Sequence, residues 1–305
     1  MDFAHSEKAG TVDATAQEAV LSKVKGADGG VNLRLEVGSR SDIGRVRANN
    51  EDTCRVNEDL KLFVIADGMG GEAHGELASG IAGDSVAGFC AGNVHHEDEE
   101  FEFEAGDEAG ELIQRMTARE TDAAAEEGLS ERTRRLGSAA RLANRRIFEC
   151  ALKDPQLRGM GATLVAAWVD GARMSLVNVG DSRAYLLRDS ELKQLTNDHT
   201  LVEEQVRRGL IKPEDVHRSK MQNVLIRALG VKSEVELDEA EFDLRGGDIL
   251  LLCTDGLTRM AGDAEIARVL MGRGGAQEKA DGLVKLANEK GGDDNVSVIV
   301  VGVEA

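Results

Sequence analysis

The chain has 305 residues, 41% of them hydrophobic, and its 56 acidic against 37 basic residues give a formal net charge of −19. That length is enough to bury the core of one large domain or of two small ones. The negative charge argues against nucleic acid and anionic membranes as partners, and it repels phosphorylated ligands unless bound cations reverse the potential locally.

No apolar stretch approaches the roughly 20 residues of a membrane-spanning helix, and the N-terminus lacks the layout of a secretory signal. The four cysteines are scattered without a C-x-x-C pair, which indicates reduced thiols rather than a disulfide framework or a zinc site. We therefore expect a soluble, cytoplasmic protein.

Residues 1–34 are polar and show no sustained hydrophobic period, which predicts a flexible tail ahead of one domain at 35–303. Short apolar runs bounded by glycine and polar residues predict strands. The predicted strands are 61–66, 162–169, 173–179, 184–187, 249–254 and 296–303. Apolar residues at helical spacing predict the helices, which are 75–91, 138–152, 199–208, 263–271 and 276–289.

Strands outnumber long helices, and the two types do not alternate strictly along the chain. This order favours an α+β fold with antiparallel sheets over a doubly wound parallel sheet. Residues 92–132 form an acidic insertion, because six of the eight residues at 97–104 are acidic and such a segment favours solvent. His95 and His96 beside these acids could bind a metal, but a surface loop is the simpler interpretation.

Two predicted strands end in the same way, since "LFVIADGMGG" and "ILLLCTDG" are apolar runs that stop at an Asp-Gly pair. Two further acid clusters lie just ahead of apolar strands, in "RANNEDT" and in "GGDDNVSVIVVGV". The acids concerned are Glu51 with Asp52, Asp67, Asp255, and Asp293 with Asp294.

Carboxylates that gather at one point repel one another unless cations lie between them. Oxygen ligands without a nearby histidine or cysteine select Mg²⁺ or Mn²⁺ over zinc, and glycine lets a main-chain carbonyl approach the ion. Taken singly, however, an Asp-Gly pair after a strand is most often only a turn. Composition and spacing alone leave a metal site and a set of ordinary turns equally open.

The stretch "GMGGEA" after the predicted strand 61–66 formally satisfies the dinucleotide-binding pattern G-x-G-x-x-G/A. That pattern requires a second parallel strand ending in an acid about 20 residues further on, and here an acidic segment follows instead. No P-loop sequence occurs either, so we do not favour a nucleotide site.

Eight stretches, in order along 35–303, resemble the metal-dependent protein phosphatases, the type 2C serine/threonine family in its bacterial form. They are "SDIGRVRANNED", "ADGMGG", "MGATL", "NVGDSRAY", "LTNDHT", "LIRALG", "CTDGLT" and "GGDDNVSVIVV". The resemblance implies a β-sandwich of two antiparallel sheets flanked by helices, with a centre of two Mg²⁺ or Mn²⁺ ions at one end.

The same resemblance implies the ligands of that centre. Asp67 would bridge the two ions, and the main-chain carbonyl of Gly68 would bind one of them. Asp255 and Asp294 would hold the other ion, and Glu51 would act directly or through water.

Supporting residues follow from the resemblance as well. Arg47 would clamp the substrate phosphate, since a planar guanidinium can bind two phosphate oxygens at once. Asp52 would orient the site, and Asn295 would support Asp294 from behind. Asp181 matches a position linked to a third, weaker metal.

The implied function is hydrolysis of phosphoserine and phosphothreonine in proteins, with a Ser/Thr kinase as the opposing enzyme. Two cations about 3.5–4 Å apart lower the pKa of a shared water and bind both the attacking and the leaving oxygen. The alternative is a non-catalytic regulator that binds phosphoproteins on the same fold. We take a monomer as the expected state.

Two residues depart from the family pattern. Met69 stands where eukaryotic members usually carry a histidine that protonates the leaving group, so water is the expected proton donor here. Arg259 stands where many relatives have an acid, and a fixed cation there should weaken binding of a third metal. Residues 201–225 match a mobile flap, and Cys253 is expected to be a small core residue.

Overall fold

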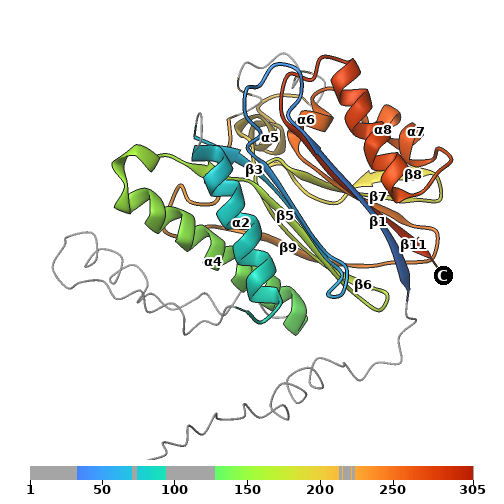
Figure 1. The fold of residues 1–305 in the computed structure, drawn as a ribbon, viewed down its shortest axis with the longest axis horizontal. Coiled ribbons are helices and arrows are strands. Elements are labelled where there is room, and N and C mark those ends of the chain that lie inside the picture. Colours follow the sequence, from blue (N-terminus) through green and yellow to red (C-terminus); the bar gives the residue numbers. More distant parts are fainter. Residues whose placement is uncertain are drawn as a thin grey trace, which may run out of the picture. The chain divides into compact units, whose positions relative to one another are not determined.

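Two antiparallel sheets lie face to face at the centre of the structure, a computed structural model (Figure 1). It describes residues 33–70, 74–93, 128–212, 215, 221 and 224–304. The first sheet has the strand order β1-β11-β10-β7-β8, and the second has the order β2-β3-β5-β6-β9 with β4 paired to β3.

The strands are β1 (Arg34–Asp42), β2 (Asp52–Asn57), β3 (Leu62–Met69), β4 (Gly161–Ala162), β5 (Leu164–Asp170), β6 (Arg173–Val179), β7 (Arg183–Arg188), β8 (Glu191–Gln194), β9 (Asp238–Asp243), β10 (Ile249–Cys253) and β11 (Val296–Glu304). The helices are α2 (His74–Cys90), α4 (Glu131–Lys153), the 3₁₀ turn η2 (Pro155–Leu157), α5 (Leu201–Arg207), α6 (Asp255–Thr258), α7 (Asp263–Leu270) and α8 (Ala276–Glu289).

Strand β3 shows why the central strands are continuous apolar runs. Side chains alternate between the two faces of a strand, and both faces of β3 are covered. Phe63 and Ile65 pack between the two sheets, while Leu62, Val64 and Ala66 pack against α2 and α4. A run of five buried residues is therefore what this position requires.

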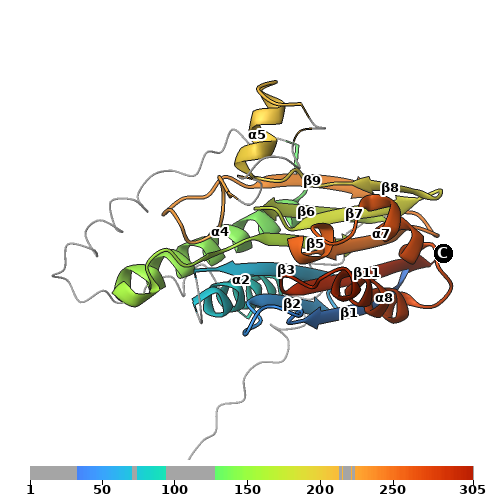
Figure 2. The ribbon, with the colours of Figure 1, turned by 90° about the horizontal axis from the view of Figure 1, so that it is seen from above.

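Helices cover the outer face of each sheet, with α2 and α4 on one side and α7 and α8 on the other (Figure 1). In α8 the buried residues Ala280, Leu283, Val284 and Ala287 form one stripe at helical spacing. The result is four layers in the order helix, sheet, sheet, helix. Figure 2 shows α5 standing apart from these layers.

These layers confirm the predicted α+β sandwich of antiparallel sheets. Strands β1, β2, β8 and β9 have no counterpart among the predicted elements, because they are short or half-exposed and carry many charged residues. Helix α4 begins at Glu131, seven residues before the predicted start. Its first turns are rich in arginine, and the Ser130 side chain caps them by accepting a hydrogen bond from the Thr133 N–H.

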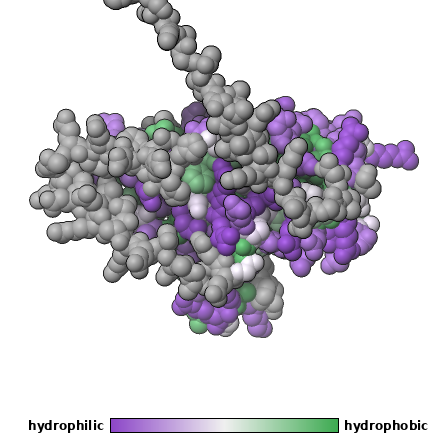
Figure 3. Space-filling model, turned by 90° about the horizontal axis from the view of Figure 1, so that it is seen from below, coloured by the Kyte–Doolittle hydropathy of each residue, from purple (hydrophilic) through white to green (hydrophobic). Residues whose placement is uncertain are grey.

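The early start of α4 corrects one predicted boundary, since residues 131 and 132 are helical and not part of the acidic insertion. Most of that insertion, the His95-His96 pair and residues 1–32 of the predicted tail lie outside the described residues. The last two residues of the predicted tail belong to the domain, because Leu33 is buried and Arg34 begins β1. All described residues belong to one unit, 32–305. None of the described helices is long and apolar enough to span a membrane. The residues coloured in Figure 3 are mostly hydrophilic, with small and separate apolar patches.

We expect Leu252→Ala to lower the free energy of unfolding by about 2–5 kcal/mol, because Leu252 is fully buried between the two sheets. Urea denaturation followed by circular dichroism measures this loss. Leu210→Ala is the matched control: its side chain is 70% exposed, so the change should stay within about 0.5 kcal/mol. Equal losses in both variants would contradict the layered core.

Candidate metal centre

The pairing of β2 with β3 places Asp52 directly opposite Asp67. The Asp67 N–H donates to Oγ1 of Thr163 at 2.9 Å, and the Asp67 carbonyl accepts from the Thr163 N–H at 2.8 Å. Asp67 is thus held on one side by β2 and on the other by the start of β5. This arrangement fixes the backbone from which its carboxylate projects.

Asn295 ties the loop before β2 to the start of β11. Its Oδ1 accepts from the Glu51 N–H at 2.8 Å, and its Nδ2 donates to the carbonyls of Ile43 at 2.9 Å and Asn49 at 2.8 Å. The Asn295 N–H donates to Oδ1 of Asp294 at 2.9 Å. Asn295 therefore contacts Glu51 through its buried side chain and Asp294 through its backbone N–H.

Asp255 is the first residue of α6, immediately after β10. The next residue must be glycine, because a Cβ on Gly256 would lie 1.9 Å from the Asn295 carbonyl oxygen. The preceding Thr254 donates to Oδ2 of Asp52 at 3.0 Å, and its hydroxyl accepts from the Ser297 N–H at 3.0 Å. Strands β2, β10 and β11 are thereby joined at the point where the acids meet.

Seven of the nine predicted site residues line one cavity of about 1100 Å³. They are Arg47, Glu51, Asp67, Gly68, Asp181, Asp255 and Asp294. Asp52 and Asn295 lie behind the cavity wall, where they hold the lining residues through the hydrogen bonds described above. The structure thus brings together acids that are more than 200 positions apart in the sequence.

The crowded carboxyl groups hold their protons strongly. Burial raises the pKa of Asp52 to about 7, with added repulsion from Asp255 and Asp294. Burial, then repulsion from Asp255 and Asp198, raises the pKa of Asp181 to about 7. The pKa values of Asp67 and Asp255 are also raised, in each case chiefly by burial. The protein alone therefore supplies too little positive charge at this point.

Several features fit hard divalent cations. The donor set consists of carboxylate oxygens, and the buried Oδ1 atoms of Asp52 and Asp255 accept no hydrogen bond. As the side chains stand, however, no three His, Cys, Asp or Glu side chains among the described residues are grouped to hold one ion.

Two arginines contact the carboxylate of Asp294. Arg47 contacts Asp294 through Nε and through Nη2, each at 2.8 Å. Arg259 lies at the end of α6 and contacts Asp294 at 2.7 Å and Asp255 at 3.4 Å. The guanidinium groups thus neutralise the same oxygens that a cation would bind.

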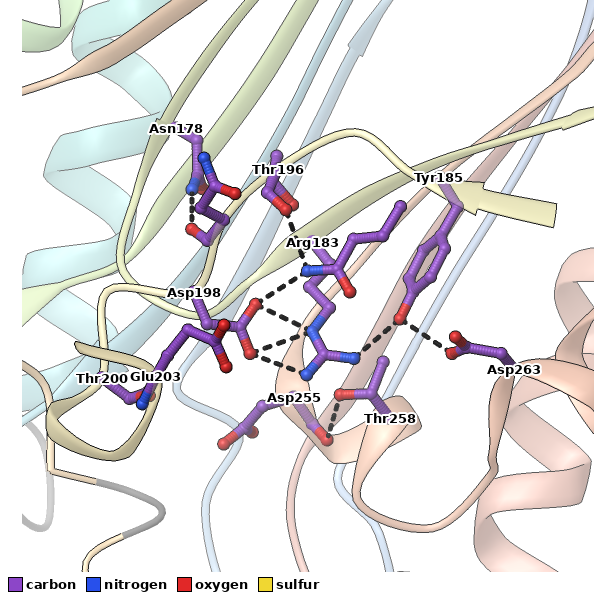
Figure 4. A network of polar contacts seen from close by, with 12 residues as sticks. Asn178, Arg183, Tyr185, Thr196, Asp198, Thr200, Glu203, Asp255, Thr258 and Asp263 are labelled. Carbon is purple, nitrogen blue, oxygen red and sulfur yellow. Dashed lines mark hydrogen bonds and ion pairs between the residues drawn. The ribbon is translucent and has the colours of Figure 1, made fainter. Parts of the chain in front are cut away.

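An ion-pair network behind the centre was not anticipated from the sequence (Figure 4). Arg183 donates to Asp198 through Nε at 2.9 Å and Nη2 at 2.7 Å, and Nη1 donates to the Tyr185 hydroxyl at 2.8 Å. Tyr185 in turn donates to Asp263 at 3.2 Å. The stretches "GDSR" and "LTNDHT" contain Arg183 and Asp198, but their spacing gives no sign that the two side chains pair.

Asp198 also acts on the centre itself. Its charge contributes to the raised pKa of Asp181 and of Asp255, and Figure 4 shows Asp255 near the Arg183–Asp198 pair. Next to it, the buried His199 accepts the Gly180 N–H at Nδ1 (3.1 Å), which fixes the backbone that leads into Asp181. His199 thus supports Asp181 through the Gly180 backbone, and Asp198 acts on Asp181 and Asp255 through its charge.

The sequence also matches a known family. Residues 44–273 fit the family model described as protein phosphatase 2C. The chain belongs to this family. The resemblance drawn from the eight sequence stretches is thereby confirmed.

Relatives in this phosphatase family match most of the chain. The serine/threonine phosphatase stp of Listeria innocua is 36% identical over 86% of this chain and 93% of its own length. The serine/threonine phosphatase PstP/Ppp of Mycobacterium tuberculosis has a crystal structure with a TM-score of 0.72 and 37% identity, covering 89% of this chain and 99% of that one. The PstP catalytic domain in complex with two manganese ions gives a TM-score of 0.70 at 36% identity, covering 90% and 100%.

We expect the metal-free protein to lose stability as the pH rises from about 4 to about 7. The carboxyls of Asp52 and Asp181 have a pKa near 7 in the folded state against 3.8 without the fold. In that window the folded state binds more protons than the unfolded state, so raising the pH favours unfolding. Urea unfolding in EDTA at pH 5 and pH 7.5 measures the difference.

The test variant is Asp67→Asn, which removes one charge from the cluster and should reduce the loss of stability between the two pH values. Asp293→Asn, one residue from Asp294 and exposed, should leave the loss unchanged. A wild-type protein that is more stable at pH 7.5 than at pH 5 in EDTA would contradict the crowding of these carboxyls.

Proposed function

We propose that this protein hydrolyses phosphoserine and phosphothreonine in other proteins with water activated by two Mg²⁺ or Mn²⁺ ions. The observation that carries the proposal is that Asp67, Asp255 and Asp294 line one cavity together with Arg47. Family membership supports the reaction class, and the solved PstP domain with two manganese ions supports the choice of metal.

The candidate ligands are Asp67, the main-chain carbonyl of Gly68, Asp255, Asp294 and Glu51. When bound there, the ions would supply a water of lowered pKa and bind the attacking and leaving oxygens. Gly68 permits β3 to approach the start of α2 closely, since a Cβ on it would lie 2.0 Å from the Gly75 carbonyl oxygen. Its N–H donates to the Glu51 carbonyl at 3.1 Å, which keeps Glu51 beside the centre.

Arg47 is the candidate phosphate clamp. Its side chain is 50% exposed at the cavity wall, and its two contacts with Asp294 orient the planar guanidinium beside the carboxylates. A phosphate oxygen can replace a carboxylate oxygen as the acceptor without loss of geometry. Met69 lines the same cavity, and its thioether side chain has no acidic proton, so water is the proposed proton donor to the leaving group.

Asp52, Asn295 and Asp181 complete the proposal. Asp52 and Asn295 position the ligands through the hydrogen bonds to Thr254 and Glu51. Asp181 is the proposed ligand of a third, weaker metal, and the Arg259 guanidinium opposes that metal by its positive charge. Arg259 already pairs with Asp255 at 3.4 Å, one helical turn along α6.

The proposed partners are phosphorylated proteins and the Ser/Thr kinase that produces them. A net charge of −19 disfavours nucleic acid and membrane surfaces, and we propose a cytoplasmic monomer. A non-catalytic regulator on the same fold is the second candidate. Arg259 and the acidic insertion are its only support, and the candidate metal ligands are all present, so it is not favoured.

We expect Asp67→Asn and Asp255→Asn each to lower kcat/KM on a phosphothreonine peptide by at least about a thousandfold in Mn²⁺, because each removes a charged ligand of the ions that would activate the water. Phosphate release from wild type should also stop in EDTA and return with Mn²⁺. Asp293→Asn is the matched control and should keep wild-type activity, since Asp293 does not line the cavity.

Activity that persists in EDTA or survives both substitutions would reject the proposed function. Metal-dependent binding of the phosphopeptide without phosphate release would favour the regulator instead. Circular dichroism of each variant establishes that a loss of activity is not a loss of fold.

We expect Arg259→Met to bind Mn²⁺ more tightly at its weakest site, by roughly fivefold in isothermal titration calorimetry. Removing a positive charge near the ion relieves a repulsion of about 1 kcal/mol or more, which corresponds to about fivefold in affinity. Arg268→Met on the exposed face of α7 is the control and should leave the Mn²⁺ affinity unchanged. Equal affinity in the wild type and the Arg259 variant would show that Arg259 does not oppose the metal.

A further inference from the structure

The cavity of the candidate metal centre also has an apolar part, lined by Leu210, Ile226 and Val231, which we call the groove. Nine large hydrophobic side chains are exposed among the described residues, and more than half of them lie within the short span 210–231. These are Leu210, Met221, Val224, Ile226 and Val231. Three of them, Leu210, Ile226 and Val231, line the cavity. Exposed apolar side chains that share one cavity mark a binding surface more often than scattered ones do.

The groove begins next to the candidate metal ligands. A Cβ on Gly161 would lie 2.6 Å from Cε of Met69 and 3.2 Å from Cγ2 of Val231, so these two apolar ends meet over Gly161. Met69 directly follows Gly68 at the end of β3. The apolar wall is therefore continuous with the place where the phosphate is proposed to bind.

The backbone that presents Val231 is held firmly. Leu229 exchanges two hydrogen bonds with Ala162, at 3.1 and 2.8 Å. The buried Asn144 of α4 accepts the Gly230 N–H at 2.8 Å and donates to the carbonyls of Lys232 at 3.1 Å and Ser233 at 3.0 Å. Val231 lies between these anchored residues with 49% of its surface exposed. A rigid, exposed apolar side chain is suited to recognition.

The charged residues of the groove largely neutralise one another. Arg208 pairs with Glu204 at 2.6 Å, and Arg227 pairs with Glu236 at 2.7 Å. The remaining two charged residues of this part of the cavity, Lys232 and Glu234, have opposite signs. The groove therefore offers a partner apolar surface more than net charge.

We propose that this groove binds a bulky aliphatic side chain of the substrate, located close in sequence to the phosphorylated residue. The inference rests on the proposed phosphatase function and names its substrate class: phosphoserine or phosphothreonine peptides with leucine, isoleucine, valine or methionine beside the phosphorylated position. Covering the exposed Val231 and Ile226 removes apolar surface from water, which favours binding of such a side chain.

The test compares phosphothreonine peptides in an alanine and serine background, in Mn²⁺. Leucine, glycine or aspartate is placed in turn at each of the three positions on either side of the phosphothreonine. Leucine should raise kcat/KM about tenfold over glycine at one or two positions, mainly by lowering KM, a difference that corresponds to about 1.4 kcal/mol. Aspartate at those positions should do no better than glycine.

Two variants locate the effect. Val231→Asp should reduce the preference for leucine over glycine to less than twofold, because a carboxylate then faces the apolar side chain. Met271→Asp is the matched control, since Met271 is 51% exposed at the end of α7 and does not line the cavity. It should keep the full preference, and thermal unfolding of both variants checks that each is folded.

The outcomes separate the two proposals. Hydrolysis of all peptides without a preference for leucine overturns the groove and leaves the phosphatase function standing. No hydrolysis of any peptide overturns the function and the groove together. A rise in activity of Val231→Asp on every peptide would mean that the protein's own chain covers the groove, and this result also overturns the inference.

Discussion

Mutual repulsion among buried carboxylates is the constraint on which this structure depends. Asp52 and Asp67 meet because β2 and β3 pair, and Asp255 and Asp294 join them from the ends of β10 and β11. Burial raises the pKa values of Asp52, Asp67 and Asp255, so the fold places charge where it is poorly solvated. Such an arrangement destabilises the protein alone, and the cations that we propose to bind there would offset this cost.

The acids of the site could be predicted from the sequence because each lies next to an apolar run that is visible in the local sequence. A strand that is covered on both faces is apolar throughout, so the point within β3 where the apolar run gives way to Asp67 is visible in the sequence. The pairing of Arg183 with Asp198 has no comparable pattern in the sequence. It depends on the course of the loop after β8, which brings Asp198 next to the start of β7. Arg259 makes one contact of each kind. Its contact with Asp255 follows from the sequence, because the two residues are one helical turn apart, whereas its contact with Asp294 depends on the tertiary fold.

The fold could be predicted to a similar depth. The buried strands β5, β6, β10 and β11 have clear apolar runs, and the stripe of α8 has clear helical spacing. Strand β9, with the sequence "DEAEFD", is half-exposed at the edge of its sheet, so tertiary pairing with β6 makes it a strand where its composition does not. Helix α4 begins earlier than its apolar pattern because the Ser130 cap, not hydrophobic spacing, sets its start.

The position of β11 has a consequence for synthesis of the protein. This last strand lies between β1 and β10 and pairs with β1 over nine residues, from Arg34 opposite Glu304 to Asp42 opposite Val296. Until β11 has been translated, β1 and β10 have no strand to join them, and Asn295 has not yet reached the Glu51 loop. The candidate site can therefore assemble only after β11 has been made.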